Sequence, residues 1–511
     1  MLPKKILLLT GITCAVFCGF TQSPVNNFNV VLDTLDSKIL GEKRPIAIIL
    51  PDKYSKTKDS FDVFYATDGE WTTKIAASFA EFLSIQFIPQ NIIVTVPNSK
   101  TDEQGHRERD FLPTRVPYFN ESGGADKFLS FFSDELIPYI NAKYRTTRIN
   151  NMYGSSFGGV FSMYTFLKKP ELFKSYMLAD PAFQYDNRVM VRMADSLLPK
   201  LSVNNTNFLM TGRAGKAFKE MGIAAMDSLF RKKAPAGLRY KLNVYDDETH
   251  NSMIFRTIYD GLKFAYSGYS NDPLVIYPSN GTMVPGQPLK VFYQAEMLKN
   301  LHYTVDGTHP TEQSPKVDSD FIVLNGPSEL ILRSISNNEK YDQVAKGSYK
   351  SGTALKGIKL SKKAKPGGLN YYFYQGQWDS LPDFRKIKVK QTGVADSAFG
   401  MNKLPADKNF ALVQEGFIEI KDDGYCYLGL NCNGAARLIF AGSTLIDIPA
   451  NQDENAINAT VVPLTKGIYP VRIEYHNKVG SPYCHLFYLP PGKEDTQTIP
   501  VEFQYAIRKG S

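Results

Sequence analysis

The sequence predicts an α/β region built on a largely parallel sheet, followed by all-β structure. Between residues 24 and 272, short runs rich in β-branched and aromatic residues alternate with longer runs of helical character. Such alternation is typical of parallel strands joined by helices that cover both faces of the sheet. After residue 272 the helical runs give way to short β-rich runs broken by glycine, proline and asparagine. A chain of 511 residues is also too long for a single core, so several domains are expected.

The elements of the first region can be placed from these runs. The expected strands are residues 46–50, 61–66, 92–96, 150–153, 175–178, 207–211 and 240–245. The expected helices between them include residues 75–87, 127–143 and 221–232. In open parallel sheets, chemistry gathers at the carboxyl ends of the strands. Residues that directly follow these runs are therefore the candidates for a functional site.

One such stretch, Gly154-Ser155-Ser156-Phe157-Gly158, has the pattern G-x-S-x-G. It follows an expected strand and precedes a helix-compatible run, residues 160–167. A sharp strand-to-helix turn needs glycine where a Cβ would collide across it. Such a turn exposes the Ser156 hydroxyl and aims the Phe157 backbone N–H at a developing oxyanion. A Gly/Ser-rich loop is the alternative interpretation, and the flanking strand and helix favour the nucleophile.

Histidine is scarce, which narrows the choice of a catalytic base. The chain has six histidines, and only His106 and His250 lie within residues 24–272. The chain order in serine hydrolases of this type is serine, acid, histidine. His106 precedes Ser156, whereas His250 comes in the loop after a late expected strand. His250 is therefore the predicted base.

Several further motifs occur in a fixed order around the Ser156 pentapeptide. They are Arg44-Pro45-Ile46 leading to Leu50-Pro51, Tyr65-Ala66-Thr67-Asp68-Gly69, Arg109-Asp110-Phe111-Leu112-Pro113, Glu135-Leu136-Ile137-Pro138 with Tyr144-Arg145, the extension to Gly159, Pro170 with Leu172-Phe173, and Glu248-Thr249-His250. Together they resemble the secreted esterase branch of the α/β-hydrolases, which includes siderophore, feruloyl and acetyl-xylan esterases. The resemblance implies an α/β-hydrolase fold over residues 24–272. It also implies Ser156 as nucleophile, His250 as base, and the N–H groups of Phe157 and Glu70 as oxyanion donors.

The acid of the triad is where the sequence departs from this family. The resemblance places the acid shortly after the strand that ends here at Thr211-Gly212, yet no carboxylate follows before Glu220. We therefore predict that Glu220 reaches back from the start of the next helix. Asp180, Asp247 and Glu248 are the other candidates, and a Ser–His dyad without an acid is a further alternative.

Two β modules are expected after residue 272. Residues 273–361, around Tyr303–Thr311, resemble the small β-sandwich appended to bacterial hexosaminidases. Residues 362–511, with Tyr371–Trp378 and Asp422-Asp423-Gly424, resemble the PA14 β-barrel module. Sugar-binding PA14 modules hold calcium in an acidic loop, but the following loop, residues 431–434, adds no carboxylate. We therefore predict no metal, and either a structural role or weak carbohydrate contact.

The N-terminus and the cysteines bear on the cellular compartment. Lys4 and Lys5 precede an apolar run, residues 6–20, which is typical of a secretory signal; we assign residues 1–23 to it. The protein is thus expected to be secreted, periplasmic or at the cell surface, with Cys14 and Cys18 as alternative lipid-attachment sites. The three later cysteines, Cys426, Cys432 and Cys484, fit no complete disulfide framework. Buried free thiols are favoured over a Cys426–Cys484 bridge.

The functional prediction combines these parts. The net charge of +8 is scattered along the chain, so no nucleic-acid partner is expected. The leading hypothesis is a secreted serine esterase that removes acyl groups from carbohydrate without a metal or organic cofactor. The carbohydrate substrate rests on the β modules alone. A siderophore esterase and a non-catalytic surface-binding protein on the same scaffold are the alternatives. The oligomeric state is left open.

Overall fold

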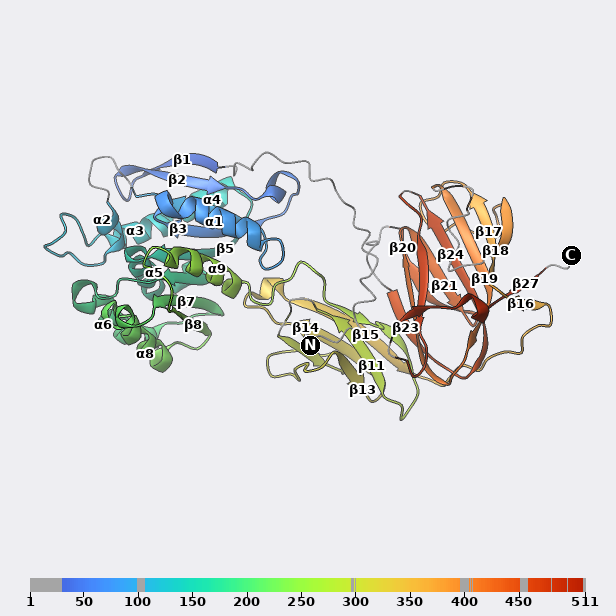
Figure 1. Ribbon diagram of the computed structural model, residues 1–511. Helices are drawn as coiled ribbons and strands as arrows, with labels where there is room; N and C mark the ends of the chain where they lie inside the picture. Colours follow the sequence, from blue (N-terminus) through green and yellow to red (C-terminus); the bar gives the residue numbers. More distant parts are fainter. Residues whose placement is uncertain are drawn as a thin grey trace.

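A computed structural model of the chain describes residues 30–508 except 99–105, 296–297, 299, 396–403, 405, 407, 451–457, 479 and 494. Figure 1 shows an α/β region followed by two β-rich regions, with the first of these lying between the α/β region and the C-terminal one. The predicted signal segment, residues 1–23, lies outside the described residues. None of the described helices is long and apolar enough to cross a membrane.

The α/β region is built on an eight-stranded sheet with the order β1-β2-β4-β3-β5-β6-β7-β8. The strands are β1 (Val30–Ser37), β2 (Glu42–Ile49), β3 (Phe61–Thr67), β4 (Asn91–Val96), β5 (Thr146–Ser155), β6 (Ser175–Ala179), β7 (Thr206–Arg213) and β8 (Leu238–Tyr245). β2 pairs antiparallel with β1 and β4, and the remaining pairs are parallel. The expected α/β-hydrolase architecture is thus present, and each predicted strand overlaps an observed one. β1 was not predicted.

Helices cover both faces of this sheet. They are α1 (Gly69–Leu83), α2 (Arg107–Phe111), α3 (Ala125–Ser130), α4 (Ile137–Lys143), α5 (Phe157–Lys168), α6 (Tyr185–Leu197), α7 (Lys216–Glu220), α8 (Ile223–Lys233) and α9 (Met253–Ala265). The side chains of β3 alternate between the two resulting cores, because successive strand residues point to opposite faces. Val63 and Tyr65 join the core under α5, and Phe64 and Ala66 join the core under α1 and α9.

The C-terminal half contains no α-helix among its described residues, as the sequence predicted. Its strands are β9 (Val275–Tyr277), β10 (Asn280–Met283), β11 (Leu289–Gln294), β12 (Leu301–Thr304), β13 (Phe321–Leu324), β14 (Ser328–Ser334), β15 (Gln343–Ser351), β16 (Ala364–Pro366), β17 (Leu369–Gln375), β18 (Gln391–Ala395), β19 (Phe410–Ile420), β20 (Gly424–Cys432), β21 (Ala435–Phe440), β22 (Ser443–Ile448), β23 (Asn458–Leu464), β24 (Gly467–Asn477), β25 (Cys484–Leu489), β26 (Gln497–Thr498) and β27 (Gln504–Ile507).

The two β-rich regions are joined by one continuous sheet. Its order is β12-β14-β15-β10-β23-β20-β25-β26, so strands from both predicted modules belong to it. The joint is a parallel pairing of Asn280 and Gly281 in β10 with Thr460 and Val461 in β23. The hydroxyl of Tyr427 also donates to the carbonyl of Lys290 across the joint at 2.8 Å. The two regions are therefore hydrogen-bonded neighbours and are not joined by a linker alone.

The three described cysteines are buried and free. Cys432 and Cys484 face each other across β20 and β25, while Cys426 lies at another position of β20. Burial raises the pKa of the Cys426 and Cys432 thiols to about 12. Free thiols were the favoured prediction, and the Cys426–Cys484 bridge does not form.

Candidate functional site

Ser156 occupies a strained turn between β5 and α5. Its backbone angles, φ 54° and ψ −113°, lie where residues other than glycine are uncommon. Such a conformation costs about 1–3 kcal/mol and persists only where the surroundings enforce it. A Cβ on Gly154 would lie 2.1 Å from the carbonyl oxygen of Gly158, and one on Gly158 would lie 2.5 Å from Thr67 Oγ1. Gly154 is therefore required by close approach of the backbone, and Gly158 by close approach of the Thr67 side chain.

The turn is tied to the end of the neighbouring strand. The N–H of Ser156 donates to the carbonyl of Ala179 at 2.9 Å, and the N–H of Ala182 donates to the carbonyl of Ser156 at 3.2 Å. Ala179 is the last residue of β6, so these bonds hold Ser156 beside the residue that follows that strand. That residue is Asp180.

Asp180 accepts a hydrogen bond from the predicted base. His250 Nδ1 lies 2.6 Å from Asp180 Oδ2, and Asp180 is fully buried. Arg213, the last residue of β7, donates through Nε to the same oxygen at 2.6 Å. Burial would raise the pKa of Asp180, but the hydrogen bonds from His250 and Arg213 outweigh it and the pKa is lowered. Asp180 is therefore an ionised carboxylate that orients one nitrogen of His250.

The structure corrects the prediction for Glu220. Glu220 ends α7, a helix with no buried residue, and its side chain is 60% exposed. Its carboxylate lies 3.2 Å from Lys216 Nζ, one helical turn away, and His250 is bonded to Asp180 instead. α7 lies on the surface, and the ion pair of Glu220 is with Lys216 of the same helix. Asp180, one of the sequence alternatives, takes the place beside His250.

Glu248, another of the candidate carboxylates near His250 along the chain, is also engaged elsewhere. Glu248 Oε1 lies 2.6 Å from Arg256 Nε, and Oε2 accepts a hydrogen bond from the Ser252 hydroxyl. The remaining histidine of this region, His106, bonds through Nδ1 to Glu121 at 2.9 Å. Of the two histidines, His250 is thus the one that joins the residues following β5 and β6, Ser156 and Asp180, at the carboxyl ends of the strands.

Two helix N-termini meet beside Ser156. α1 begins after Asp68 and α5 begins after Ser156, and Gly158 packs against Thr67 and Asp68. The first N–H groups of a helix lack intrahelical acceptors and attract negative charge. Glu70 and Phe157 are among the first residues of these two helices, where backbone N–H groups have no intrahelical acceptor. The expected oxyanion donors are therefore placed at two adjacent helix starts.

Aromatic rings surround this corner of the sheet. The Phe157 ring makes edge contacts with Phe119 and Tyr185, at centroid distances of 5.8 and 6.0 Å. Trp71, in the first turn of α1, and Tyr118 are 57% and 64% exposed. Exposed aromatic side chains beside a nucleophile provide apolar contact area for a bound substrate.

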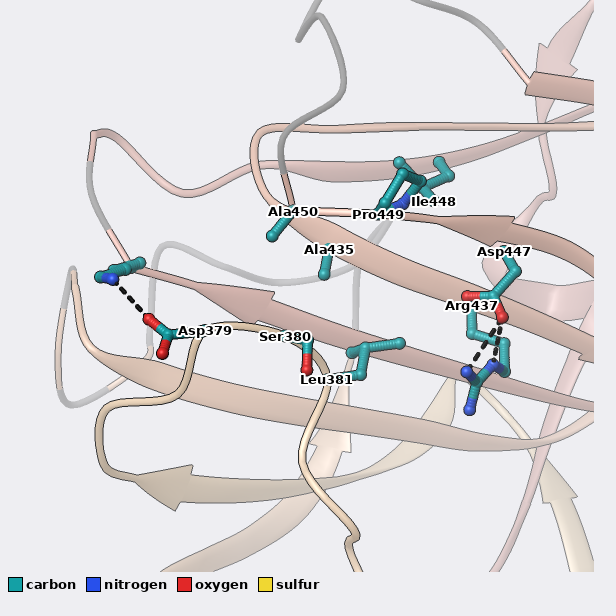
Figure 2. A pocket seen from close by; sticks show the side chains of 10 residues that line it. Asp379, Ser380, Leu381, Ala435, Arg437, Asp447, Ile448, Pro449 and Ala450 are labelled. Carbon is teal, nitrogen blue, oxygen red and sulfur yellow. Dashed lines mark hydrogen bonds and ion pairs between the residues drawn. The ribbon is translucent and has the colours of Figure 1, made fainter.

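Two depressions in the described surface lie away from this group. One, of about 550 Å³, is on the C-terminal region, where Arg437 pairs with Asp447 and Asp379 pairs with Lys478 (Figure 2). The other, of about 560 Å³, lies where the α/β region meets β-rich residues Lys340 and Tyr341. No group of three or more His, Cys, Asp or Glu residues in the described chain is arranged to hold a metal ion.

Comparison with known proteins places an esterase relationship on the α/β region. Residues 37–196 match the family model described as "Putative esterase". The chain is 25% identical over 176 residues to the ferri-bacillibactin esterase BesA of Bacillus subtilis, covering 31% of this chain and 61% of that protein. It is 30% identical over 89 residues to a siderophore enterobactin esterase of Emericella nidulans, covering 16% of this chain and 28% of that protein.

A solved structure is also similar. An IroE-like serine hydrolase from Shewanella oneidensis is 28% identical, with a TM-score of 0.43, and the match covers 46% of this chain and 79% of that one. The alignments with the two curated esterases span less than two thirds of either protein's length. The family match includes Ser156 and Asp180, and His250 lies beyond its last residue.

Proposed function

We propose that this protein hydrolyses carboxylic esters, with Ser156 as nucleophile, His250 as base and Asp180 as the acid of a triad. The observation that carries the proposal is the hydrogen bond of 2.6 Å between His250 Nδ1 and buried Asp180, whose neighbouring residues hold the strained Ser156 turn. A retained esterase scaffold without activity would have no need of a buried carboxylate bonded to this histidine. The esterase family match supports the same reaction class.

The proposed reaction gives each of these groups one role. Ser156 Oγ attacks the ester carbonyl carbon while His250 Nε2 takes the hydroxyl proton. Asp180 stabilises the imidazolium that forms. The backbone N–H groups of Phe157 and Glu70 bind the oxyanion. The alcohol leaves with the proton from His250, and water activated by His250 then releases the acid and restores Ser156.

The relatives and the aromatic surroundings bear on the substrate. Acyl groups on carbohydrate were the leading hypothesis, and their support is the resemblance of the β modules. The names of the curated relatives instead favour a siderophore ester. Exposed Trp71 and Tyr118 favour a small ester with a ring-bearing group. We therefore propose a small ester that carries an aromatic ring as the substrate, and keep the carbohydrate ester as the second candidate.

Export remains part of the proposal. Its support is Lys4 and Lys5 before the apolar run of residues 6–20, as in a secretory signal. An exported location suits an enzyme whose substrate arrives from outside the cell.

The first test compares Ser156→Ala and His250→Ala with wild type on p-nitrophenyl acetate and on an aromatic ester. Each substitution should remove several powers of ten in kcat, roughly 10⁶ for a triad nucleophile. A fluorophosphonate should label wild type at Ser156, as read by mass spectrometry, and should not label Ser156→Ala.

Matched controls are available for both residues. His106→Ala should keep its activity, because the His106 ring bonds to Glu121 and His250 is the histidine bonded to Asp180. Ser78→Ala, on the exposed side of α1, should do the same. Activity above a few per cent in Ser156→Ala, or equal losses in His106→Ala and His250→Ala, would refute the proposal.

A further inference from the structure

Arg107, the first residue of α2, reaches into the space between the two helix starts. Its Nε and Nη2 donate to the two carboxylate oxygens of Asp68 at 2.6 and 3.1 Å. Nη2 also lies 3.2 Å from the carbonyl oxygen of Ser155, the residue before the nucleophile. One guanidinium therefore contacts both the residue that precedes α1 and the residue that precedes Ser156.

Asp68 needs such a partner because of its position. Its backbone is left-handed, with φ 56° and ψ 50°, and its carbonyl accepts the N–H groups of Trp71 and Thr72 at the start of α1. Only 1% of Asp68 is exposed, so its charge is desolvated and must be paired. The pairing with Arg107 holds this residue in the conformation from which α1 starts.

A second set of contacts, from the residues after β4, holds the same turn. The N–H of Asn98 donates to Glu70 Oε1 at 2.7 Å, and Asn98 Nδ2 donates to Asp68 Oδ1 at 2.9 Å. Gly69 lies against Pro97, where a Cβ would come within 2.7 Å of the proline nitrogen. The segment from Asp68 to Glu70 is thus fixed by Arg107 through Asp68, and by Asn98 through both Asp68 and the Glu70 carboxylate.

The alternative is that Arg107 binds an anionic group of the substrate. Its charge is already matched by Asp68 in a two-point ion pair, and its side chain is only 18% exposed. Its guanidinium also lies over the rings of Trp71, Phe111 and Phe157, at 5.8, 5.4 and 5.5 Å from their centroids. These contacts leave little of the guanidinium open to a ligand, so a structural pairing fits better than anion recognition.

We propose that the Arg107–Asp68 ion pair positions the oxyanion donor at Glu70 relative to Ser156. The inference rests on the ester hydrolysis proposed above. Neither side chain touches the reacting atoms in this account, so both are positioning residues. Their loss should misplace a donor that is needed in the transition state more than in the bound ester.

The test measures kcat and KM of Arg107→Met, Arg107→Lys and Asn98→Ala in the full chain. Activity is expressed per active site titrated with a fluorophosphonate. Two esters are used, neutral p-nitrophenyl acetate and an ester that carries a free carboxylate. Arg107→Met should lower kcat about 10²-fold on both, as for loss of an oxyanion donor, with KM little changed. Arg107→Lys should recover part of this loss, because lysine keeps the charge but not the two-point geometry.

Asn98→Ala provides a second approach to the same turn, should Arg107→Met fail to fold. It should also lower kcat without raising KM. Arg231→Ala is the control for loss of an arginine, because Arg231 is exposed and pairs only with Asp227 on α8. A kcat within threefold of wild type in both Arg107→Met and Asn98→Ala would overturn the inference.

Two further outcomes separate the competing explanations. A rise of KM confined to the anionic ester would assign Arg107 to substrate binding and overturn the positioning role. If the proposed function itself were wrong, the result would differ, because the Ser156→Ala protein would then stay active. The two failures are therefore distinguishable in one set of proteins.

Discussion

Asp180 gives the candidate site its electrostatic character. It is buried, has a left-handed backbone with φ 41°, and receives His250 and Arg213 on one carboxylate oxygen. A buried carboxylate without partners would take up a proton, whereas two cationic or polar donors keep it ionised. The residue that ends β7 is thus a cation that pairs with the acid, and the acid itself follows β6.

The assignment of the acid can be tested by two conservative substitutions. Asp180→Asn keeps the size of the side chain, and asparagine tolerates the left-handed backbone, so the fold should survive. It would favour the wrong tautomer of His250, which costs about 10⁴ in kcat in a serine protease triad. Measurement of kcat/KM on one ester, with thermal unfolding as the check on folding, gives the answer.

Glu220→Gln is the matched comparison. It removes an exposed i,i+4 ion pair with Lys216, and such pairs contribute little to stability or to a distant site. The variant should stay within about twofold of wild type in kcat/KM. A large loss in Glu220→Gln together with an active Asp180→Asn would restore the original sequence prediction and remove the triad proposed here.

The turn from β5 to α5 works as a unit with the turn from β3 to α1. β3 and β5 are parallel neighbours, so their carboxyl ends bring Thr67 and Asp68 against Gly158. The absence of a side chain at Gly158 allows the two helix starts to approach each other. Close packing of this kind makes the geometry of the proposed oxyanion donors depend on the absence of a methyl group at Gly158.

Gly158→Ala tests that dependence. The new Cβ would lie 2.5 Å from Thr67 Oγ1 and 3.1 Å from Asp68 Oδ2, so the Thr67 side chain or the two turns must shift. Overpacking typically costs about 1–3 kcal/mol, and we expect a lower free energy of unfolding together with a reduced kcat. The measurements are urea unfolding and single-ester kinetics.

A second substitution separates the clash from other effects. Thr67→Ala removes the hydroxyl that the new methyl group would meet, so the double variant should recover part of the loss. Gly326→Ala is the control, because a Cβ at Gly326 meets nothing within 4 Å. A Gly158→Ala protein with unchanged stability and kcat would show that the two turns are not coupled.

Over the whole molecule, the candidate site and the first β-rich region lie at opposite ends of the parallel strands of the α/β sheet. α2, which carries Arg107, lies at the end of the α/β region away from β14 and β15 (Figure 1). The loop between β14 and β15 contacts the amino ends of the parallel strands. Lys340 lies 3.3 Å from buried Asp62 at the start of β3, and Glu339 lies 3.0 Å from Lys174, just before β6. The first β-rich region therefore contacts the sheet at the amino ends of its parallel strands, opposite the carboxyl ends where the candidate site lies.

Two truncated chains separate the contribution of the first β-rich region to stability from its contribution to ester hydrolysis. A chain that ends at Leu360 keeps Lys340 and the rest of the loop, so its kcat/KM on a small ester should match the full chain. A chain that ends at Asp272 loses Lys340 and leaves Asp62 with fewer partners. Asp62 is buried but the Lys340 side chain is 39% exposed, so water screens this ion pair, and its loss should lower the melting temperature modestly.

The comparison needs stability and kinetics on the same samples. The chain that ends at Leu360 also loses the β10–β23 pairing, which belongs to a different sheet from the strand that leads to Ser156. If it folded but lost small-ester activity, residues after 360 would have to contribute to the site. If the chain ending at Asp272 melted like the full chain, the β-rich support would have no role in stability.

The sequence by itself determined the features that depend on neighbours along the chain. The nucleophile turn was predictable because glycine, serine, a strand run and a helix run lie within a few residues of each other. The parallel strands were predictable because buried strands are continuously apolar. β1 was missed for the same reason: it is an edge strand with exposed residues, among them Leu32 at 80% exposure, and lacks that signal.

Only the tertiary structure decided which carboxylate meets His250. Sequence reasoning favoured Glu220 because the expected acid position lay just before it. The observed partner comes from 70 residues upstream, through the pairing of β5 with β6 and the return of the loop after β8. The continuous sheet through β10 and β23 is likewise a contact between distant segments. Strand register between such segments depends on packing of the whole sheet, and no local pattern of residues encodes it.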